Sequence, residues 1–74
     1  MTTRSRLLDC FRAVFPDFSD EQLAAATTDN TPAWDSIALV TLVTLVEEEF
    51  GIDLPPDDYG ILLSFDAFAA RLAP

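Results

Sequence analysis

The chain has 74 residues, half of them hydrophobic, and thirteen acidic against four basic residues give it a formal net charge of −9. This length allows one domain, residues 1–74, with a single small core, and the hydrophobic content argues against disorder. The negative charge argues against nucleic acid and anionic membrane as partners and favours a basic protein surface. No basic residue occurs between Arg12 and Arg71, and solubility alone would not require so long a stretch without one.

The single cysteine, Cys10, cannot form an internal disulfide, which fits a reducing cytoplasm. It falls near the edge of an apolar helix face, so we interpret it as a packing residue. The chain has no histidine, and we find no catalytic base, metal-ligand spacing or glycine-rich phosphate loop. We therefore expect a protein that is not an enzyme. No signal peptide follows Met1 and no apolar run is long enough to cross a bilayer, so we expect a cytoplasmic monomer.

Hydrophobic periodicity predicts an all-α fold. Apolar residues at helical spacing predict an amphipathic helix over residues 3–15, which Pro16 ends. The connection 16–34 carries a capping-box sequence at Ser19, followed by one or two helical turns and then a polar loop. Phe18 and Leu23 are expected to hold this long connection on the core.

The strongest helical signal covers residues 36–50. Asp35 is suited to cap its N-terminus, and Gly51 supplies the stop. A second apolar stripe begins with Ile37 and Val40, opposite the stripe that we assign to the core. Either this helix is central, or these two side chains are exposed for a partner, and we favour the partner. The stripe assigned to the core consists of Leu39, Leu42, Val43, Val46 and Phe50.

Two further helices are predicted after Gly51. Residues 57–63 can form a short helix, led by Pro56 and weakened by Gly60, which we expect to be the least stable element. Ser64 is expected to cap a last helix whose core face holds Phe65 and Phe68. The expected architecture is a four-helix bundle with three main helices, a short third helix and a long first loop.

Ser36 has two possible uses. A serine that opens a helix lies at the positive end of the helix dipole, beside unpaired backbone N–H groups, which suits attachment or binding of a phosphate. The alternative is that Asp35 and Ser36 simply cap the helix, which is the commoner use of these residue types. These residues alone favour capping.

Three glutamates, Glu47, Glu48 and Glu49, occupy the last turn of the same helix. Carboxylates there oppose the helix dipole, at a cost of about 0.3–1 kcal/mol each when exposed. Stability alone would favour lysine or arginine. One interpretation is a solvated charged face, and the other is that the acids are kept for a partner that they bind.

The chain resembles the acyl carrier protein and peptidyl carrier protein family. The resemblance rests on the segment Trp34-Asp35-Ser36-Ile37, similar to the family's Asp-Ser-Leu motif, and on VEEEFGI at residues 46–52, similar to its Glu-Glu-Phe-Gly-Ile helix end. It covers nearly the whole chain. The resemblance implies an acyl-carrier-like bundle in which a phosphopantetheinyl transferase, using coenzyme A and Mg²⁺, attaches 4′-phosphopantetheine to Ser36, with Asp35 as motif neighbour.

The resemblance also implies partners and a cargo. Acyl, aminoacyl or peptidyl groups would be carried as thioesters on the arm, and loading, condensing and tailoring enzymes would present basic docking surfaces. Ile37 and Val40 would supply an apolar contact to these partners. Glu47 and Glu48 would meet their basic residues. Fast, reversible association would follow from such electrostatic steering.

Some residues depart from the family pattern. Ile37 replaces leucine, Trp34 replaces a frequent glycine, and Phe65 and Phe68 are bulky where a fatty-acid carrier keeps a cavity. These departures favour a polyketide, nonribosomal-peptide or specialised fatty-acyl pathway over housekeeping fatty-acid synthesis. The competing hypothesis is an acidic helical interaction module that binds non-covalently and has no prosthetic group.

Overall fold

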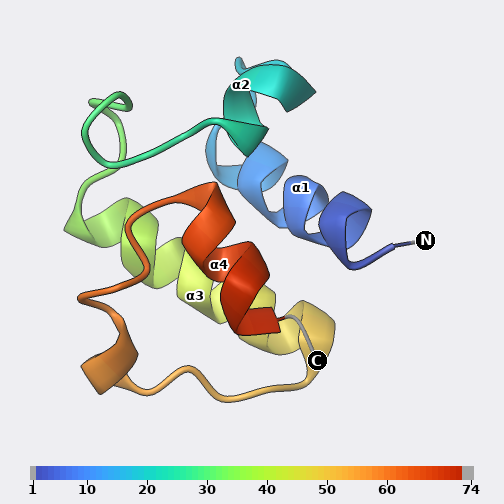
Figure 1. The fold of residues 1–74 in the computed structure, drawn as a ribbon, viewed down its shortest axis with the longest axis vertical. Coiled ribbons are helices and arrows are strands. Elements are labelled where there is room, and N and C mark those ends of the chain that lie inside the picture. The colour runs from blue at the N-terminus through green and yellow to red at the C-terminus, as the bar shows by residue number, and fades with distance from the viewer. Residues whose placement is uncertain (1, 73–74) are drawn as a thin grey trace.

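The computed structural model describes residues 2–72, and this part of the chain forms four α-helices: α1 (Thr3–Val14), α2 (Asp20–Ala24), α3 (Ser36–Phe50) and α4 (Phe65–Leu72) (Figure 1). A 3-10 turn, η1 (Pro56–Asp58), lies between α3 and α4. No strand occurs within residues 2–72, where an isolated antiparallel bridge pairs Thr27 with Ser64. The predicted all-α fold is confirmed, and none of these helices is long and apolar enough to span a membrane.

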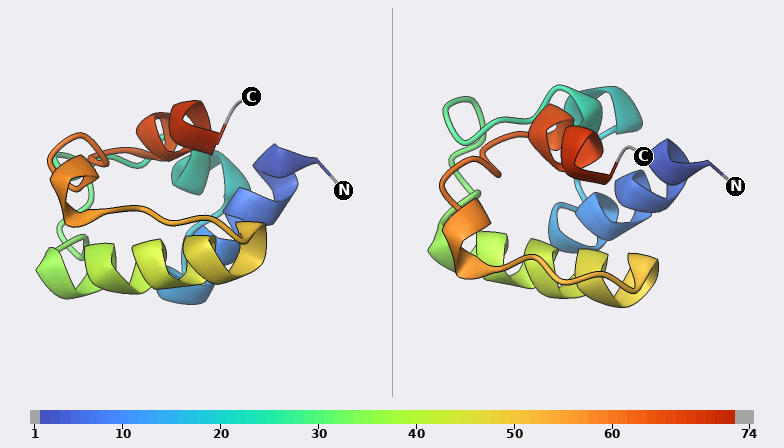
Figure 2. Two further views of the ribbon diagram at one scale, coloured as in Figure 1. Left: turned by 90° about the horizontal axis from the view of Figure 1, so that it is seen from below. Right: turned by 60° about the horizontal axis from the view of Figure 1, so that its bottom comes forward.

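Helix α1 packs against the other three α-helices, α2, α3 and α4, and holds them together. Its N-terminus is capped by Thr2, whose Oγ1 accepts the Ser5 N–H at 3.1 Å. It ends at Val14, one residue before the predicted end, because Phe15 precedes a proline and leaves helical geometry. Figure 2 shows α3 along one side of the molecule and α4 along the other, with α1 contacting both.

The core is centred on the ring of Phe11. This ring packs edge-on against Trp34, Phe65 and Phe68, with centroid separations of 5.5, 5.1 and 5.4 Å. Aromatic pairs of this geometry contribute about 0.5–1.5 kcal/mol beyond the area that they bury. Most of the α3 residues that the sequence assigns to the core are buried in it, as predicted, whereas two of them are only partly buried at its edge. The buried members are Leu42, Val43 and Val46, and the marginal ones are Leu39 and Phe50.

The predicted capping box at Ser19 is present. Ser19 Oγ accepts the Gln22 N–H at 3.2 Å, and Gln22 Oε1 accepts the Ser19 N–H at 2.8 Å. Leu23 is buried, and the Phe18 ring stacks on Phe15 with centroids 5.5 Å apart. These contacts hold the connection between α1 and α3 on the core, as predicted.

The prediction of a short α-helix over residues 57–63 is wrong. Only the η1 turn forms, and the hydrogen bonds within and after it span three residues instead of four: Asp58 N–H to Pro55 C=O, Tyr59 to Pro56, Ile61 to Asp58 and Leu62 to Tyr59. Gly60 disfavours a regular helix here. In addition, the Leu63 C=O accepts the Thr28 N–H at 3.0 Å, which holds the end of the segment extended beside the first loop.

Candidate functional site

The N-terminus of α3 is capped by Asp35 alone. Asp35 has extended backbone geometry, its Oδ1 accepts the Ala38 N–H at 2.9 Å, and its C=O accepts the Leu39 N–H at 3.0 Å. Ser36 is the first residue of the helix and is exposed. The structure therefore assigns capping to the aspartate. It leaves the serine accessible at the positive end of the helix dipole.

A phosphate group fits this position. The backbone N–H groups of a first helical turn and the dipole both favour negative charge, and the exposure of Ser36 leaves room for a large substituent. The neighbouring Asp35 carboxylate has an internal partner in the Ala38 N–H. The site thus offers an exposed serine and backbone N–H donors, and no arginine occurs between Arg12 and Arg71.

The outer face of α3 next to Ser36 is apolar and exposed. The Ile37 side chain is 77% exposed and that of Val40 is 52% exposed. The hydroxyls of Thr41 and Thr44 donate to the Ile37 and Val40 carbonyls, each at 2.9 Å, so that they are satisfied within the helix. This answers the question left open by the sequence: Ile37 and Val40 are not core residues. Their role in partner binding stays a prediction.

Two further exposed apolar residues, Ile61 and Leu63, were missed by sequence reasoning. They lie on the connection between η1 and α4, on either side of the buried Leu62. Such an alternation is typical of extended chain with one side buried. It was overlooked because the segment was assigned to a helix, where neighbouring residues do not alternate in this way.

The three glutamates at the end of α3 do not share one environment. Glu47 is half-buried, and its Oε2 accepts the Leu54 N–H at 2.8 Å. Glu49 forms an ion pair with Arg6 of α1 at 3.7 Å, and the same arginine donates to the Glu49 C=O. The guanidinium of Arg6 also lies 4.4 Å from the centre of the Phe50 ring. Glu48 is exposed.

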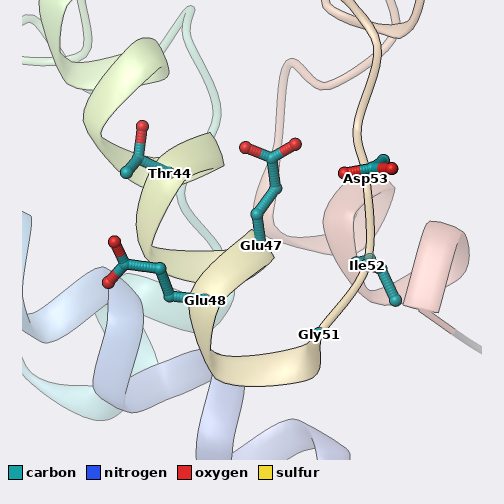
Figure 3. Close-up of a pocket in the computed structure, with 6 residues that line it drawn as sticks. All are labelled: Thr44, Glu47, Glu48, Gly51, Ile52 and Asp53. Carbon is teal, nitrogen blue, oxygen red and sulfur yellow. The ribbon is translucent and has the colours of Figure 1, made fainter.

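Glu47 and Glu48 lie together beside an open hollow at the C-terminal end of α3 (Figure 3). The Glu47 side chain extends from the helix toward the chain that carries Asp53, whereas the Glu48 side chain points away from that chain on the other side of the helix. No group of side chains able to hold a metal ion occurs within residues 2–72. The structure thus separates the predicted partner-binding residues into an apolar pair near Ser36 and an acidic pair at the far end of the same helix. The hollow is lined by Thr44, Glu47, Glu48, Gly51, Ile52 and Asp53.

A scan against protein families matches residues 34–72 to the family described as the phosphopantetheine attachment site. The match covers more than half of the chain and includes Asp35, Ser36 and all of α3 and α4. The chain belongs to this family. Searches of curated proteins and of solved structures return no match.

Membership settles several predictions. Domains of this family carry covalent 4′-phosphopantetheine, and they are carriers of thioester-linked groups that do not catalyse a reaction themselves. A carrier domain interacts with a phosphopantetheinyl transferase and with acyl-processing enzymes. The predicted cofactor and the predicted lack of enzymatic activity are therefore confirmed.

This carrier domain also has a thiol of its own. Cys10 is buried, and desolvation raises the pKa of its thiol, with a further rise from the nearby carboxylates of Glu49 and Asp9. A raised pKa keeps the thiol protonated, and the protonated form is not the nucleophile. Cys10 is therefore the packing residue that the sequence predicts.

Proposed function

We propose that this chain carries acyl, aminoacyl or peptidyl groups on a 4′-phosphopantetheine arm attached to Ser36. The observation that carries this proposal is the exposed Ser36 at the first turn of α3, beside a cap that Asp35 completes without it. Ser36 also lies within the segment matched to the family. The arm, when attached, supplies a thiol that holds the cargo as a thioester.

The residues around Ser36 have distinct roles in this proposal. Asp35 keeps the first turn of α3 closed through its bond to the Ala38 N–H. The helix dipole stabilises a phosphodiester at this position by about 0.3–1 kcal/mol. Through its bond to the Ala38 N–H, Asp35 holds the turn in shape for the transferase.

The outer face of α3 is the proposed docking surface for partner enzymes. Ile37 and Val40 are exposed and supply an apolar contact close to Ser36. Glu48 is exposed farther along the same helix and attracts basic residues of a partner. Glu47 contributes charge to the same region, although one of its oxygens is occupied by the Leu54 N–H. Long-range attraction with a small contact area supports fast and reversible association.

We also propose that the cargo stays outside the helical bundle, in a polyketide, nonribosomal-peptide or specialised fatty-acyl pathway. Phe65 and Phe68 are fully buried against Phe11, so aromatic rings fill the centre of the core. Loading with acetyl and with octanoyl groups should give the same small chemical-shift changes at core residues. Large core shifts on octanoyl loading alone would contradict the proposal.

The attachment is tested by intact mass after incubation with coenzyme A, Mg²⁺ and a promiscuous phosphopantetheinyl transferase. The wild-type chain should gain one phosphopantetheine, and Ser36→Ala should gain none while keeping its helical circular dichroism. Ser5→Ala is the matched control, because it removes a serine from α1 and should be modified like the wild type. If the folded wild type gains no mass, the alternative of a non-covalent acidic interaction module is favoured.

A further inference from the structure

The loop that leads from α2 to α3 is organised by the side chain of Asn30. Its Oδ1 accepts the Thr27 N–H at 2.8 Å and the Thr31 hydroxyl at 2.7 Å. Its Nδ2 donates to the Ala25 C=O at 3.0 Å, and its own N–H donates to Thr27 Oγ1 at 3.1 Å. Both ends of the side-chain amide are thus used, and the loop closes around them.

From Asn30 a continuous series of contacts leads to Ser36. Thr31 is only 1% exposed, and its C=O accepts the Trp34 N–H at 2.9 Å. The Trp34 ring is buried in the aromatic core against Phe11. Asp35 follows at once and caps α3. The position of the first turn of α3 therefore depends on how Thr31 and Trp34 are held.

The beginning of the same loop is fixed to a different part of the fold. The Phe65 N–H donates to the Ala26 C=O and the Thr28 N–H donates to the Leu63 C=O, each at 3.0 Å, around the bridge between Thr27 and Ser64. Figure 2 shows this part of the loop beside the chain that enters α4. Asn30 joins this anchored beginning to the buried end of the loop at Thr31.

We propose that Asn30 is a positioning residue for the modification of Ser36, acting through Thr31 and Trp34. This inference rests on the proposed function. In the reaction, Ser36 Oγ forms a bond to the phosphorus that carries the pantetheine of coenzyme A, the phosphoanhydride bond breaks, 3′,5′-ADP leaves, and the serine proton passes to a base of the transferase. Such a displacement depends strongly on the placement of the attacking oxygen.

The contacts of Asn30 lead to the turn that carries Ser36, whereas Val40 and Glu48 of the docking surface lie farther along α3. The outer face of α3, with Ile37 and Val40, starts after the Asp35 cap and makes no hydrogen bond to Asn30 among those of residues 2–72. Loosening the loop should therefore lower kcat of the transferase for this substrate and leave KM unchanged. A residue that only stabilised the fold would lower the melting temperature without this split.

The test compares Asn30→Ala with wild type and with Ser19→Ala in steady-state phosphopantetheinylation, well below the melting temperature of each. We expect kcat to fall about tenfold in Asn30→Ala, with KM unchanged. Asn30→Asp keeps the acceptor oxygens but loses the bond to Ala25, so its kcat should lie between those of the wild type and Asn30→Ala. Ser19→Ala is the control, because it removes the cap of α2 and lowers stability without touching the contacts that lead to Ser36.

Hydrogen exchange of backbone amides is the second measurement, and it needs no transferase. Exchange at residues 34–38 should be faster in Asn30→Ala and unchanged in Ser19→Ala. Wild-type kcat in Asn30→Ala, an equal loss in Ser19→Ala, or unchanged exchange at residues 34–38 would each overturn the inference. A wild-type chain that is never modified would overturn the proposed function instead, while the exchange measurement would still decide whether Asn30 orders this turn.

Discussion

The two ends of α3 are completed in opposite ways. At the N-terminal end, one local side chain, Asp35, closes the turn and leaves Ser36 exposed. At the C-terminal end, Gly51 adopts a left-handed conformation with φ 64°, and contacts from distant parts of the chain reinforce the last turn. The comparison suggests that the N-terminal end is kept accessible for chemistry, while the C-terminal end is held from within the fold.

The same comparison separates the three glutamates by whether they have a partner inside the molecule. Arginine is absent from the last turn of α3, but Arg6 of α1 reaches it and supplies the positive charge that the helix end favours. Glu47 and Glu49 therefore have partners inside the molecule. Glu48 is the glutamate for which an external partner gives the better explanation.

Among the variants that test this comparison, Arg6→Ala should have the largest effect on stability. The variant loses a hydrogen bond to the Glu49 C=O, a half-exposed ion pair and the contact with the Phe50 ring. We expect the free energy of unfolding to fall by about 1–2 kcal/mol, mostly from the hydrogen bond and the ring contact. Urea unfolding measures this change.

Arg71→Ala is the matched control for Arg6→Ala. Its side chain is similarly exposed and is paired with Asp58 at 3.3 Å, but it has no contact with α3 among the ion pairs and hydrogen bonds of residues 2–72. We expect it to lower stability by less than about 1 kcal/mol. Equal losses of stability in Arg6→Ala and Arg71→Ala would contradict the inference that Arg6 stabilises the C-terminal end of α3.

Glu47→Ala should have a smaller effect on stability. It leaves the Leu54 N–H, which is part-buried, without its acceptor, and should cost about 0.5–1.5 kcal/mol. Glu47→Gln keeps an acceptor oxygen and should cost less. Thermal unfolding of the two variants checks the order, and equal stability of Glu47→Ala and wild type would show that this bond contributes nothing.

Glu48→Gln should change stability least, because Glu48 is exposed and its charge opposes the helix dipole. We expect unfolding to be unchanged or slightly less favourable, by up to about 0.5 kcal/mol. The association rate with a basic partner such as the transferase should fall, and more so at low salt. Stopped-flow binding at two salt concentrations measures this. An unchanged rate would remove Glu48 from the docking surface.

Local signals in the sequence were sufficient for α3. Asp35 and Gly51 mark its two ends, and both positions depend on the conformation of a single residue that its own chemistry favours. Helical periodicity also placed Ile37 and Val40 opposite the core residues, but it left open whether that stripe is covered, and the structure shows both side chains exposed. The attachment-site hypothesis came from the same few residues together with the family resemblance.

Contacts between distant residues account for what the sequence could not predict. The segment 57–63 was assigned to a helix because proline and acidic residues favour a helix start, whereas its path is set partly by pairing of Leu63 with Thr28 in another loop. The reach of Arg6 across to Glu49 likewise depends on how α1 packs on α3. Neither pairing leaves a local pattern. The role of Glu47 was hidden for the same reason, since Leu54 meets it only after the chain has turned at Gly51.

The burial of Cys10 bears on how long a carried group survives. A thiolate at the surface would compete as an acceptor for any thioester held nearby, and a load transferred to it would be lost to the partner enzymes. Cys10 is the only cysteine of the chain, and its burial and its two acidic neighbours keep it protonated and sheltered. Burial of Cys10 therefore removes transfer to the protein's own thiol as a route by which the cargo is lost.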